Sequence, residues 1–217
     1  MMSPASTRIY CARIAACVIC LIMLTSACSR PGEERLAPGS VVLALGDSIT
    51  AGYGIAHDRA WPAQLAARSG WTIVNAGVSG DTTSGALARL PELLDEHLPK
   101  LVIVEIGGND MLRHVDPRQI ESNLRSIVDL AQQRGARVVL LGIPRPSAIG
   151  AATGRLSAAD IYADIARRSR SMIVLDAVAE VLSDGGLRLD PLHPNEDGHR
   201  RLAEMIERTF RDSGLLR

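Results

Sequence analysis

Cysteine is absent from nearly all of this 217-residue chain. The four cysteines are Cys11, Cys17, Cys20 and Cys28, so none falls within residues 29–217. A folded body without cysteine can contain neither a disulfide framework nor a thiolate metal site. Aromatic residues are also scarce, at 3% of the sequence, and we therefore expect a core that is mostly aliphatic.

The sequence also lacks an excess of basic or of acidic residues. The 24 basic and 24 acidic residues give a formal net charge of zero, and no basic stripe indicates a nucleic-acid partner. The spacing of His57, His97, His114 and His199 is not that of metal ligands. We expect these four histidines to be surface or packing residues, and we expect no metal site.

The N-terminal apolar run, Ile14–Leu24, is too short to span a bilayer comfortably and has the length of a signal peptide. Arg8 and Arg13 precede it, and the small residues Thr25–Ala27 separate it from Cys28. This arrangement resembles the bacterial lipoprotein signal, in which the cysteine is lipidated and becomes N-terminal after cleavage. The departure is a threonine where leucine is usual.

Three segments are therefore predicted. Residues 1–27 form a signal peptide, residues 28–40 a tether that starts at a lipidated Cys28, and residues 41–217 the folded domain. The mature chain would keep 22 basic and 24 acidic residues, a net charge of −2. We expect export, to the bacterial periplasm or to a membrane reached only through the lipid anchor. Ordinary cleavage after Ala27 is the alternative, and it would give a soluble secreted protein.

Apolar runs rich in branched residues alternate with amphipathic segments after residue 40. They predict five buried strands: Val41–Leu45, Thr72–Asn75, Leu101–Ile106, Arg137–Ile143 and Met172–Leu175. Strands that are apolar along their whole length are typical of a parallel sheet covered on both faces. The predicted fold class is therefore α/β.

Helix start and stop signals lie between these strands. Pro91 should kink or split one helix, and Ser157 with Asp160 should form a capping box. The segment Ser147–Arg155, with two glycines, should be a surface loop. The expected helices are Trp61–Arg68, Thr83–Leu94, Pro117–Arg134, one that ends near Arg168, and one that starts near Asn195 or Glu196 and buries Leu202, Ile206 and Phe210.

Polar loops lie beside the predicted strands, at the ends that share one sheet edge. Ser48 follows the first strand, residues 75–81 follow the second, and residues 107–110 follow the third, while residues 190–195 precede the last helix. Open α/β sheets bind their ligands at this edge, so we expect four loops to converge on one crevice. Either Asp47 or Ser48, taken alone, could simply cap a helix.

The residues of these loops fit acyl transfer. A serine hydroxyl is a poor nucleophile unless a base removes its proton, and His193 is the candidate base for Ser48. Asp190, three residues earlier, can bind the far ring nitrogen and fix its tautomer. A tetrahedral oxyanion needs preorganised donors, and the candidates are the backbone N–H groups of Ser48 and Gly80 and the side-chain amide of Asn109.

The blocks Gly46–Ser48, Gly80, Gly107–Asp110 and Asp190–Pro194 resemble, in this order, those of the SGNH (GDSL-type) hydrolases. The resemblance runs from residue 41 to about residue 210. It is closest to the periplasmic thioesterase/lysophospholipase and arylesterase branch. It implies a flavodoxin-like three-layer sandwich with a five-stranded parallel sheet, and no cofactor.

The same resemblance implies Ser48, Gly80, Asn109 and His193 as the four named residues of the family, with Asp190 completing the triad. Ile49 departs conservatively from the usual leucine. Related thioesterases have a mobile loop after the family asparagine, so Met111 and Leu112 are expected to contact substrate. An ordinary connection is the alternative for that loop.

The sequence thus predicts a serine esterase for small carboxylic ester or thioester substrates of the acyl-ester, arylester or lysophospholipid type. A carbohydrate O-acetylesterase of the same fold and a non-catalytic binding lipoprotein are the alternatives. An α/β-hydrolase would need a G-x-S-x-G elbow, which is missing, and no nucleotide-binding fingerprint is present. The oligomeric state is unknown.

Overall fold

The computed structural model describes residues 35–147, 150 and 153–217. The predicted signal peptide, Cys28 and most of the predicted tether lie outside the described residues, and the predicted loop 147–155 lies partly outside them. None of the helices within the described part of the chain is both long and apolar enough to cross a membrane.

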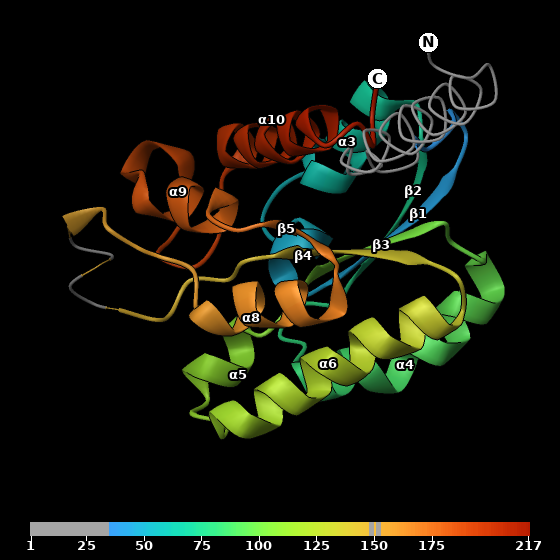
Figure 1. The fold of residues 1–217 in the computed structure, drawn as a ribbon. Coiled ribbons are helices and arrows are strands. Elements are labelled where there is room, and N and C mark those ends of the chain that lie inside the picture. The colour runs from blue at the N-terminus through green and yellow to red at the C-terminus, as the bar shows by residue number, and fades with distance from the viewer. Residues whose placement is uncertain (1–34, 148–149, 151–152) are drawn as a thin grey trace, which may run out of the picture. The chain divides into compact units, whose positions relative to one another are not determined.

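A single five-stranded sheet forms the centre of the fold (Figure 1). All neighbouring strands are parallel, in the order β2-β1-β3-β4-β5, which is the flavodoxin-like order. The predicted fold class and parallel sheet are confirmed. The strands are β1 (Val41–Gly46), β2 (Thr72–Gly77), β3 (Leu101–Glu105), β4 (Arg137–Leu141) and β5 (Met172–Val174).

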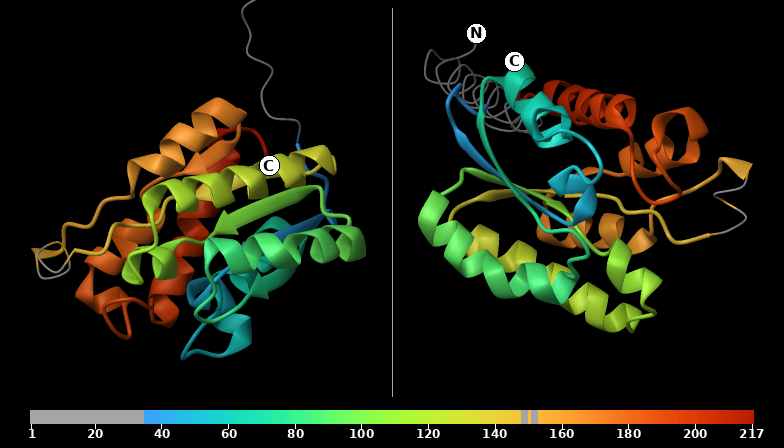
Figure 2. Two further views of the ribbon diagram at one scale, coloured as in Figure 1. Left: turned by 90° about the horizontal axis from the view of Figure 1, so that it is seen from below. Right: turned by 180° about the vertical axis from the view of Figure 1, so that it is seen from behind.

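Helices cover both faces of the sheet (Figures 1 and 2). One layer consists of α3 (Trp61–Ser69), α9 (Ala177–Ser183) and α10 (Glu196–Asp212). The other consists of α4 (Thr83–His97), α6 (Pro117–Gln133) and α8 (Asp160–Ser169). The short helices α2 (Ser48–Ala51) and α5 (Gly108–Leu112) follow strand ends, and the 3₁₀ turns are His57–Arg59 and Gly185–Leu187.

The core is mostly aliphatic, as the composition predicts. Every residue of β3 is buried, and so are residues 42–46 of β1, because helices shield both faces of the central strands. Aromatic side chains contribute to both helix layers: Tyr162 of α8 is fully buried in one, and in the other the rings of Trp71 and Phe210 are 5.7 Å apart. Trp61 is also fully buried.

Two local predictions about helices are corrected. Of the two outcomes predicted for Pro91, splitting does not occur: α4 runs from Thr83 to His97 as one helix, with Ala86 buried before Pro91 and Leu94 buried after it. The capping box of α8 is absent: Ala159 is the N-cap and contributes no side-chain bond. The carboxylate of Asp160 is exposed and instead accepts a hydrogen bond from Arg145 at 2.7 Å.

Several boundaries also differ from the sequence prediction. β2 continues two residues farther, to Gly77, whereas β3, β4 and β5 end one or two residues earlier than expected. The seven-residue helix α9 is not predicted at all. Its formation depends on tertiary packing, since five of its residues are buried and a helix this short is marginal by itself.

Candidate active site

The nucleophile turn joins β1 to α2 at the centre of the sheet edge. Asp47 caps α2, and its Oδ1 accepts the backbone N–H of Ile49 at 3.1 Å. A Cβ on Gly46 would collide with the side chain of Thr50, so the strand can turn this tightly only with glycine. This turn places Ser48 at the end of β1, half-buried and facing a cleft.

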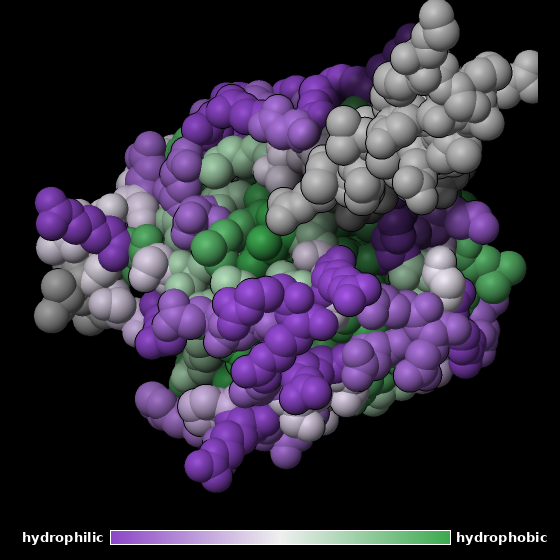
Figure 3. Space-filling model, viewed as in Figure 1, coloured by the Kyte–Doolittle hydropathy of each residue, from purple (hydrophilic) through white to green (hydrophobic). Residues whose placement is uncertain are grey.

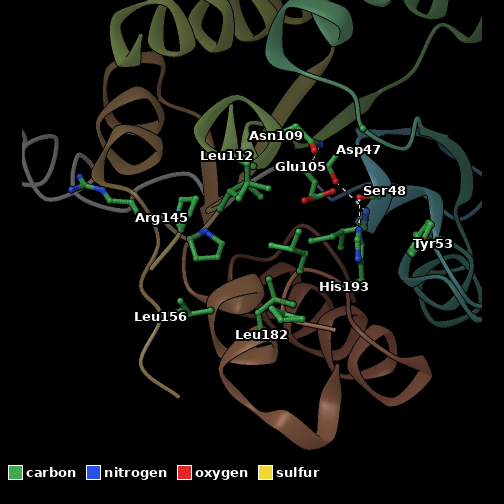
Figure 4. A pocket seen from close by; sticks show the side chains of 18 of the residues that line it. Asp47, Ser48, Tyr53, Glu105, Asn109, Leu112, Arg145, Leu156, Leu182 and His193 are labelled. Atoms are coloured by element: carbon green, nitrogen blue, oxygen red, sulfur yellow. Dashed lines mark hydrogen bonds between the residues drawn. The ribbon is translucent and has the colours of Figure 1, made fainter. Parts of the chain in front are cut away.

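Hydrogen bonds connect Ser48 to His193 (Figure 4) and His193 to Asp190. Ser48 Oγ lies 3.0 Å from His193 Nε2, and His193 Nδ1 lies 2.8 Å from Asp190 Oδ2. Asp190 also accepts the backbone N–H groups of Leu192 at 2.7 Å and His193 at 3.0 Å. The carboxylate therefore holds the imidazole and the loop backbone together.

These hydrogen bonds favour the ionised form of the Asp190 carboxyl group. Partial burial raises the pKa of this carboxyl, but the hydrogen bonds from His193 and Leu192 outweigh that effect, and the net pKa is lowered. Asp190 is thus ionised at neutral pH. With Nδ1–H of His193 donated to it, Nε2 is free to accept the proton of Ser48.

The backbone N–H groups of Ser48 and Gly80 both lie at the cleft, and neither has an acceptor in the part of the chain that is described. Gly80 has φ +79°, a left-handed conformation that favours glycine. Its carbonyl accepts a hydrogen bond from Arg113 at 2.9 Å, which fixes the orientation of this loop.

Asn109 lies on α5, opposite the nucleophile turn. Its Nδ2 donates to the carbonyl of Asp81 at 2.9 Å and to Oδ2 of Asp47 at 3.2 Å. Behind it, Asp110 is buried and accepts both the backbone N–H and the hydroxyl of Thr83, at 2.9 and 2.6 Å. These bonds tie α5 to the start of α4 and hold the amide at the cleft.

Arg89, which the sequence reasoning missed, connects three pieces of this edge. Its guanidinium donates to the carbonyls of Gly46 at 3.0 Å and Ala76 at 2.7 Å, at the ends of β1 and β2. It also donates to Oδ2 of Asp81 at 2.9 Å. One side chain therefore fixes the two strand ends and the loop that contains Gly80.

Two buried carboxyl groups lie beneath the nucleophile turn. Burial raises the pKa of Asp47 to about 6, and it raises the pKa of Glu105 well above its ordinary range. Oε2 of Glu105 accepts the hydroxyl of Thr50 at 2.7 Å, while Oε1 has no partner among the described residues. Two carboxylates cannot both be ionised cheaply here, and we infer that Glu105 keeps the proton. The only sequence signal for this residue is an acid inside an apolar strand.

The cleft has a volume of about 590 Å³ and an apolar wall. Figure 3 shows a hydrophobic hollow between the more hydrophilic surfaces of the two helix layers. Leu112, one of the two residues expected to contact substrate, lines the cleft, whereas the other, Met111, packs against the hydrophobic core. The remaining aliphatic lining consists of Ile49, Ile143, Pro144, Pro146, Leu156, Leu182, Pro191 and Leu192.

Tyr53 lies on the other side of the Ser48–His193 pair from Leu112, Leu156 and Leu182 (Figure 4). Its ring stacks against the imidazole of His193, with 4.5 Å between centroids and 37° between planes. The sequence reasoning gave Tyr53 no role, because nothing in the local pattern brings residues 53 and 193 together.

The other histidines lie apart from this arrangement. His199 is buried on α10, and its Nδ1 accepts the backbone N–H of Trp61 at the start of α3, at 3.2 Å. Burial lowers the pKa of His199 to about 4, with a smaller effect from His193. His57 and His114 are exposed. No group of three potential metal ligands occurs within the residues that the structure covers.

Comparisons with known proteins agree with this geometry. A model of the GDSL-like lipase/acylhydrolase family matches residues 44–201. The chain is 34% identical to an arylesterase of Vibrio mimicus, over 86% of this chain and 92% of that protein. It is 37% identical to thioesterase 1/protease 1/lysophospholipase L1 of Escherichia coli K12, over 79% and 84%.

A solved structure gives the same result. The crystal structure of TesA superimposes with a TM-score of 0.71 and 36% sequence identity, and the match covers 80% of this chain and 99% of that one. The family match spans well over half of the chain and includes all four loops at the sheet edge. The chain belongs to the GDSL-like lipase/acylhydrolase family.

Proposed function

We propose that this protein is a serine esterase that hydrolyses carboxylic esters or thioesters. The observation that supports it most is the chain of contacts Ser48–His193–Asp190, at 3.0 and 2.8 Å, beside an apolar cleft. Ser48 is the nucleophile, His193 the general base, and Asp190 the residue that orients the imidazole. The names of the arylesterase and thioesterase relatives support the same reaction class.

The reaction follows from these positions. Ser48 Oγ attacks the carbonyl carbon of the substrate while its proton passes to His193 Nε2. The tetrahedral intermediate then collapses, the bond to the leaving oxygen or sulfur breaks, and the same proton goes to the leaving group. Water, deprotonated by His193, attacks the acyl-enzyme carbonyl in turn and releases the acid and free Ser48.

The oxyanion is stabilised by the backbone N–H groups of Ser48 and Gly80 and by the amide of Asn109. The two backbone donors need no rearrangement, because neither has an acceptor in the described structure of the free protein. Asn109 already uses both amide hydrogens, and the longer bond, 3.2 Å to Asp47, is the one that the oxyanion displaces. Removal of one such donor typically lowers kcat by about 10²–10³-fold.

The apolar arm of the cleft takes the acyl chain. Leu112, Leu156 and Leu182 lie along this arm, whereas Met111 shapes α5 from the core side. An acetyl group is too small to reach along this aliphatic arm, so its lining favours longer acyl chains over a carbohydrate O-acetylesterase.

Export and anchoring complete the proposal. The sequence of residues 1–28 supports a signal peptide followed by lipidation at Cys28, which places the enzyme in the bacterial periplasm or at a membrane surface. Mass measurement of the mature N-terminus distinguishes a lipid-modified Cys28 from simple cleavage after Ala27.

Active-site labelling tests the catalytic proposal. A fluorophosphonate should form an adduct on Ser48, located by mass spectrometry of the folded protein. Ser48→Ala should lose the adduct and nearly all hydrolysis of p-nitrophenyl esters. Ser79→Ala is the matched control, because Ser79 also lines the cleft but has no histidine partner among the described residues, and it should keep the adduct. A folded wild-type protein that forms no adduct would favour the binding lipoprotein.

A further inference from the structure

The cleft has two sides, and the acyl arm uses only one of them. Ser48 and His193 lie between the aliphatic arm around Leu112 and Leu182 and the ring of Tyr53 (Figure 4). An ester has two parts that flank its carbonyl group. When the acyl part extends along the arm, the leaving part must therefore extend in another direction.

Proton delivery fixes that direction. His193 Nε2 must give its proton to the leaving oxygen, so the leaving group has to pass within hydrogen-bond reach of this imidazole. Tyr53 packs on the same ring, with centroids 4.5 Å apart. The alcohol or thiol part of the substrate is thus brought to the side of His193 where Tyr53 lies.

Large apolar side chains near His193 in the chain or in space are unusually exposed. Tyr53 is 53% exposed, Leu189 50% and Leu192 45%, although all three are large hydrophobic residues. Leu189 lies beside the Tyr53 turn, since a Cβ on Gly54 would come within 2.8 Å of its Cδ1. Tyr53 and Leu192 both line the cleft. Exposed apolar groups around a reactive centre are typical of a ligand-binding surface.

We propose that Tyr53, Leu189 and Leu192 form a leaving-group subsite for apolar and preferably aromatic alcohols or thiols. This inference rests on the proposed esterase function, because it depends on His193 as the proton donor. The free edge and outer face of the Tyr53 ring supply aromatic contact, and the two leucines supply aliphatic contact around it. The subsite selects the leaving group independently of the acyl chain.

The test compares two esters with the same acyl group, benzyl butyrate and propyl butyrate. Both leaving alcohols are primary and of similar basicity, so the ratio of their kcat/KM values reports contact with the ring rather than intrinsic reactivity. The wild type should prefer the benzyl ester. Tyr53→Ala should reduce this preference by roughly three- to tenfold. Tyr53→Phe should retain it, and Leu192→Ala should reduce it in the same direction.

Leu112→Ala is the matched control on the acyl arm. It removes an apolar residue of comparable exposure, 41%, and should change the preference for acyl length but not the benzyl-to-propyl ratio. Thermal unfolding of each variant confirms that it is folded before the kinetics are compared.

Two results would overturn the subsite. One is a wild type without preference for the benzyl ester, and the other is an equal loss on both esters in Tyr53→Ala, which would make Tyr53 a positioning residue for His193 alone. Failure of the esterase proposal is separately visible, because the wild type would then form no fluorophosphonate adduct on Ser48.

Discussion

The side-chain amide of Asn109 donates a hydrogen bond to Oδ2 of Asp47 at 3.2 Å, and Oδ1 of the same carboxyl accepts the backbone N–H of Ile49. Asp47 thereby connects the nucleophile turn to the residue that faces it across the cleft. The contact orients an amide whose second hydrogen is held by the carbonyl of Asp81. Both acceptors are needed to present nitrogen, not oxygen, to the substrate.

Asp47→Asn should separate the capping of α2 from the orientation of the Asn109 amide. Asparagine still caps α2, but its amide would face the amide of Asn109, and two donors cannot bond to each other. Asn109 would turn its oxygen toward residue 47 and lose its bond to Asp81. We expect kcat to fall by at least about tenfold, toward the cost of one lost oxyanion donor. Steady-state kinetics of the folded variant measure the effect, and an unchanged kcat would contradict it.

The same substitution should change how stability depends on pH. The pKa of Asp47 is about 6 in the folded protein and has an ordinary value of 3.8, so the folded state binds the proton more tightly. Ionisation of Asp47 therefore destabilises the fold progressively as the pH rises from about 4 to 6. Asp47→Asn lacks this loss, and its stability relative to wild type should increase across that window in urea unfolding. Parallel stability curves would show that Asp47 does not titrate there.

The protein should tolerate a neutral amide in place of the Glu105 carboxyl, but not the loss of the side chain. If it holds a proton, Glu105→Gln keeps an acceptor for the hydroxyl of Thr50 and removes no charge. We expect this variant to fold with nearly wild-type stability. Glu105→Ala should cost about 2–4 kcal/mol of the free energy of unfolding, because it leaves a cavity and an unpaired hydroxyl.

Thr50→Val is the control for this pair, since it preserves shape and removes only the donor to Glu105. It should be destabilised by about 1 kcal/mol. A Glu105→Gln variant as unstable as Glu105→Ala would show that the carboxyl is ionised in the folded protein. Chemical unfolding at neutral pH distinguishes these cases.

The sequence predicts those residues of the site that can be recognised from their immediate neighbours in the chain. Ser48, Gly80, Asn109 and the Asp190–His193 turn all follow or precede strong strand and helix signals, and the sheet topology then brings them to one edge. Each group could be identified from the chemistry of its own residue type.

The supporting residues could not be identified in this way. The partners of Arg89 come from the ends of two strands and the Gly80 loop, and Glu105 is one acid in an apolar strand. Tyr53 and His193 are far apart in the chain and meet only in the folded protein. The role of each depends on contacts between distant segments, about which local patterns contain no information. The capping box at Ser157 failed because of another distant contact: Ala158 pairs with Pro144 in a β-bridge, and α8 begins only at Asp160.

Replacement of Arg89, even by lysine, should lower the rate of catalysis. Its three bonds use the planar fork of the guanidinium, and the single ammonium group of lysine cannot reach all three acceptors. In Arg89→Lys the loop that contains Gly80 would lose its link to β1 and β2. We expect kcat to fall by about tenfold and the free energy of unfolding by about 1–3 kcal/mol. Arg125→Lys, at an exposed site on α6, should change neither, and equal behaviour of the two variants would refute the role of Arg89.

His199 should make the fold sensitive to acid without taking part in catalysis. Its Nδ1 accepts the backbone N–H of Trp61, and burial lowers its pKa to about 4 from an ordinary value of 6.5. The unfolded chain thus binds the proton more tightly, and stability falls as the pH drops from about 6.5 to 4.

His199→Asn tests this point directly, because asparagine keeps an acceptor near the position of Nδ1 and does not titrate. At pH 7 the variant should be less stable than wild type, since the smaller side chain leaves a void. Its deficit should shrink toward pH 4 by on the order of 2 kcal/mol, as wild type loses stability and the variant does not. Asp47 titrates in the same range but is present in both proteins, so it cancels from the difference. His57→Asn, at an exposed site, should give a constant difference near zero. A constant deficit for His199→Asn would mean that the fold does not lower the pKa of His199.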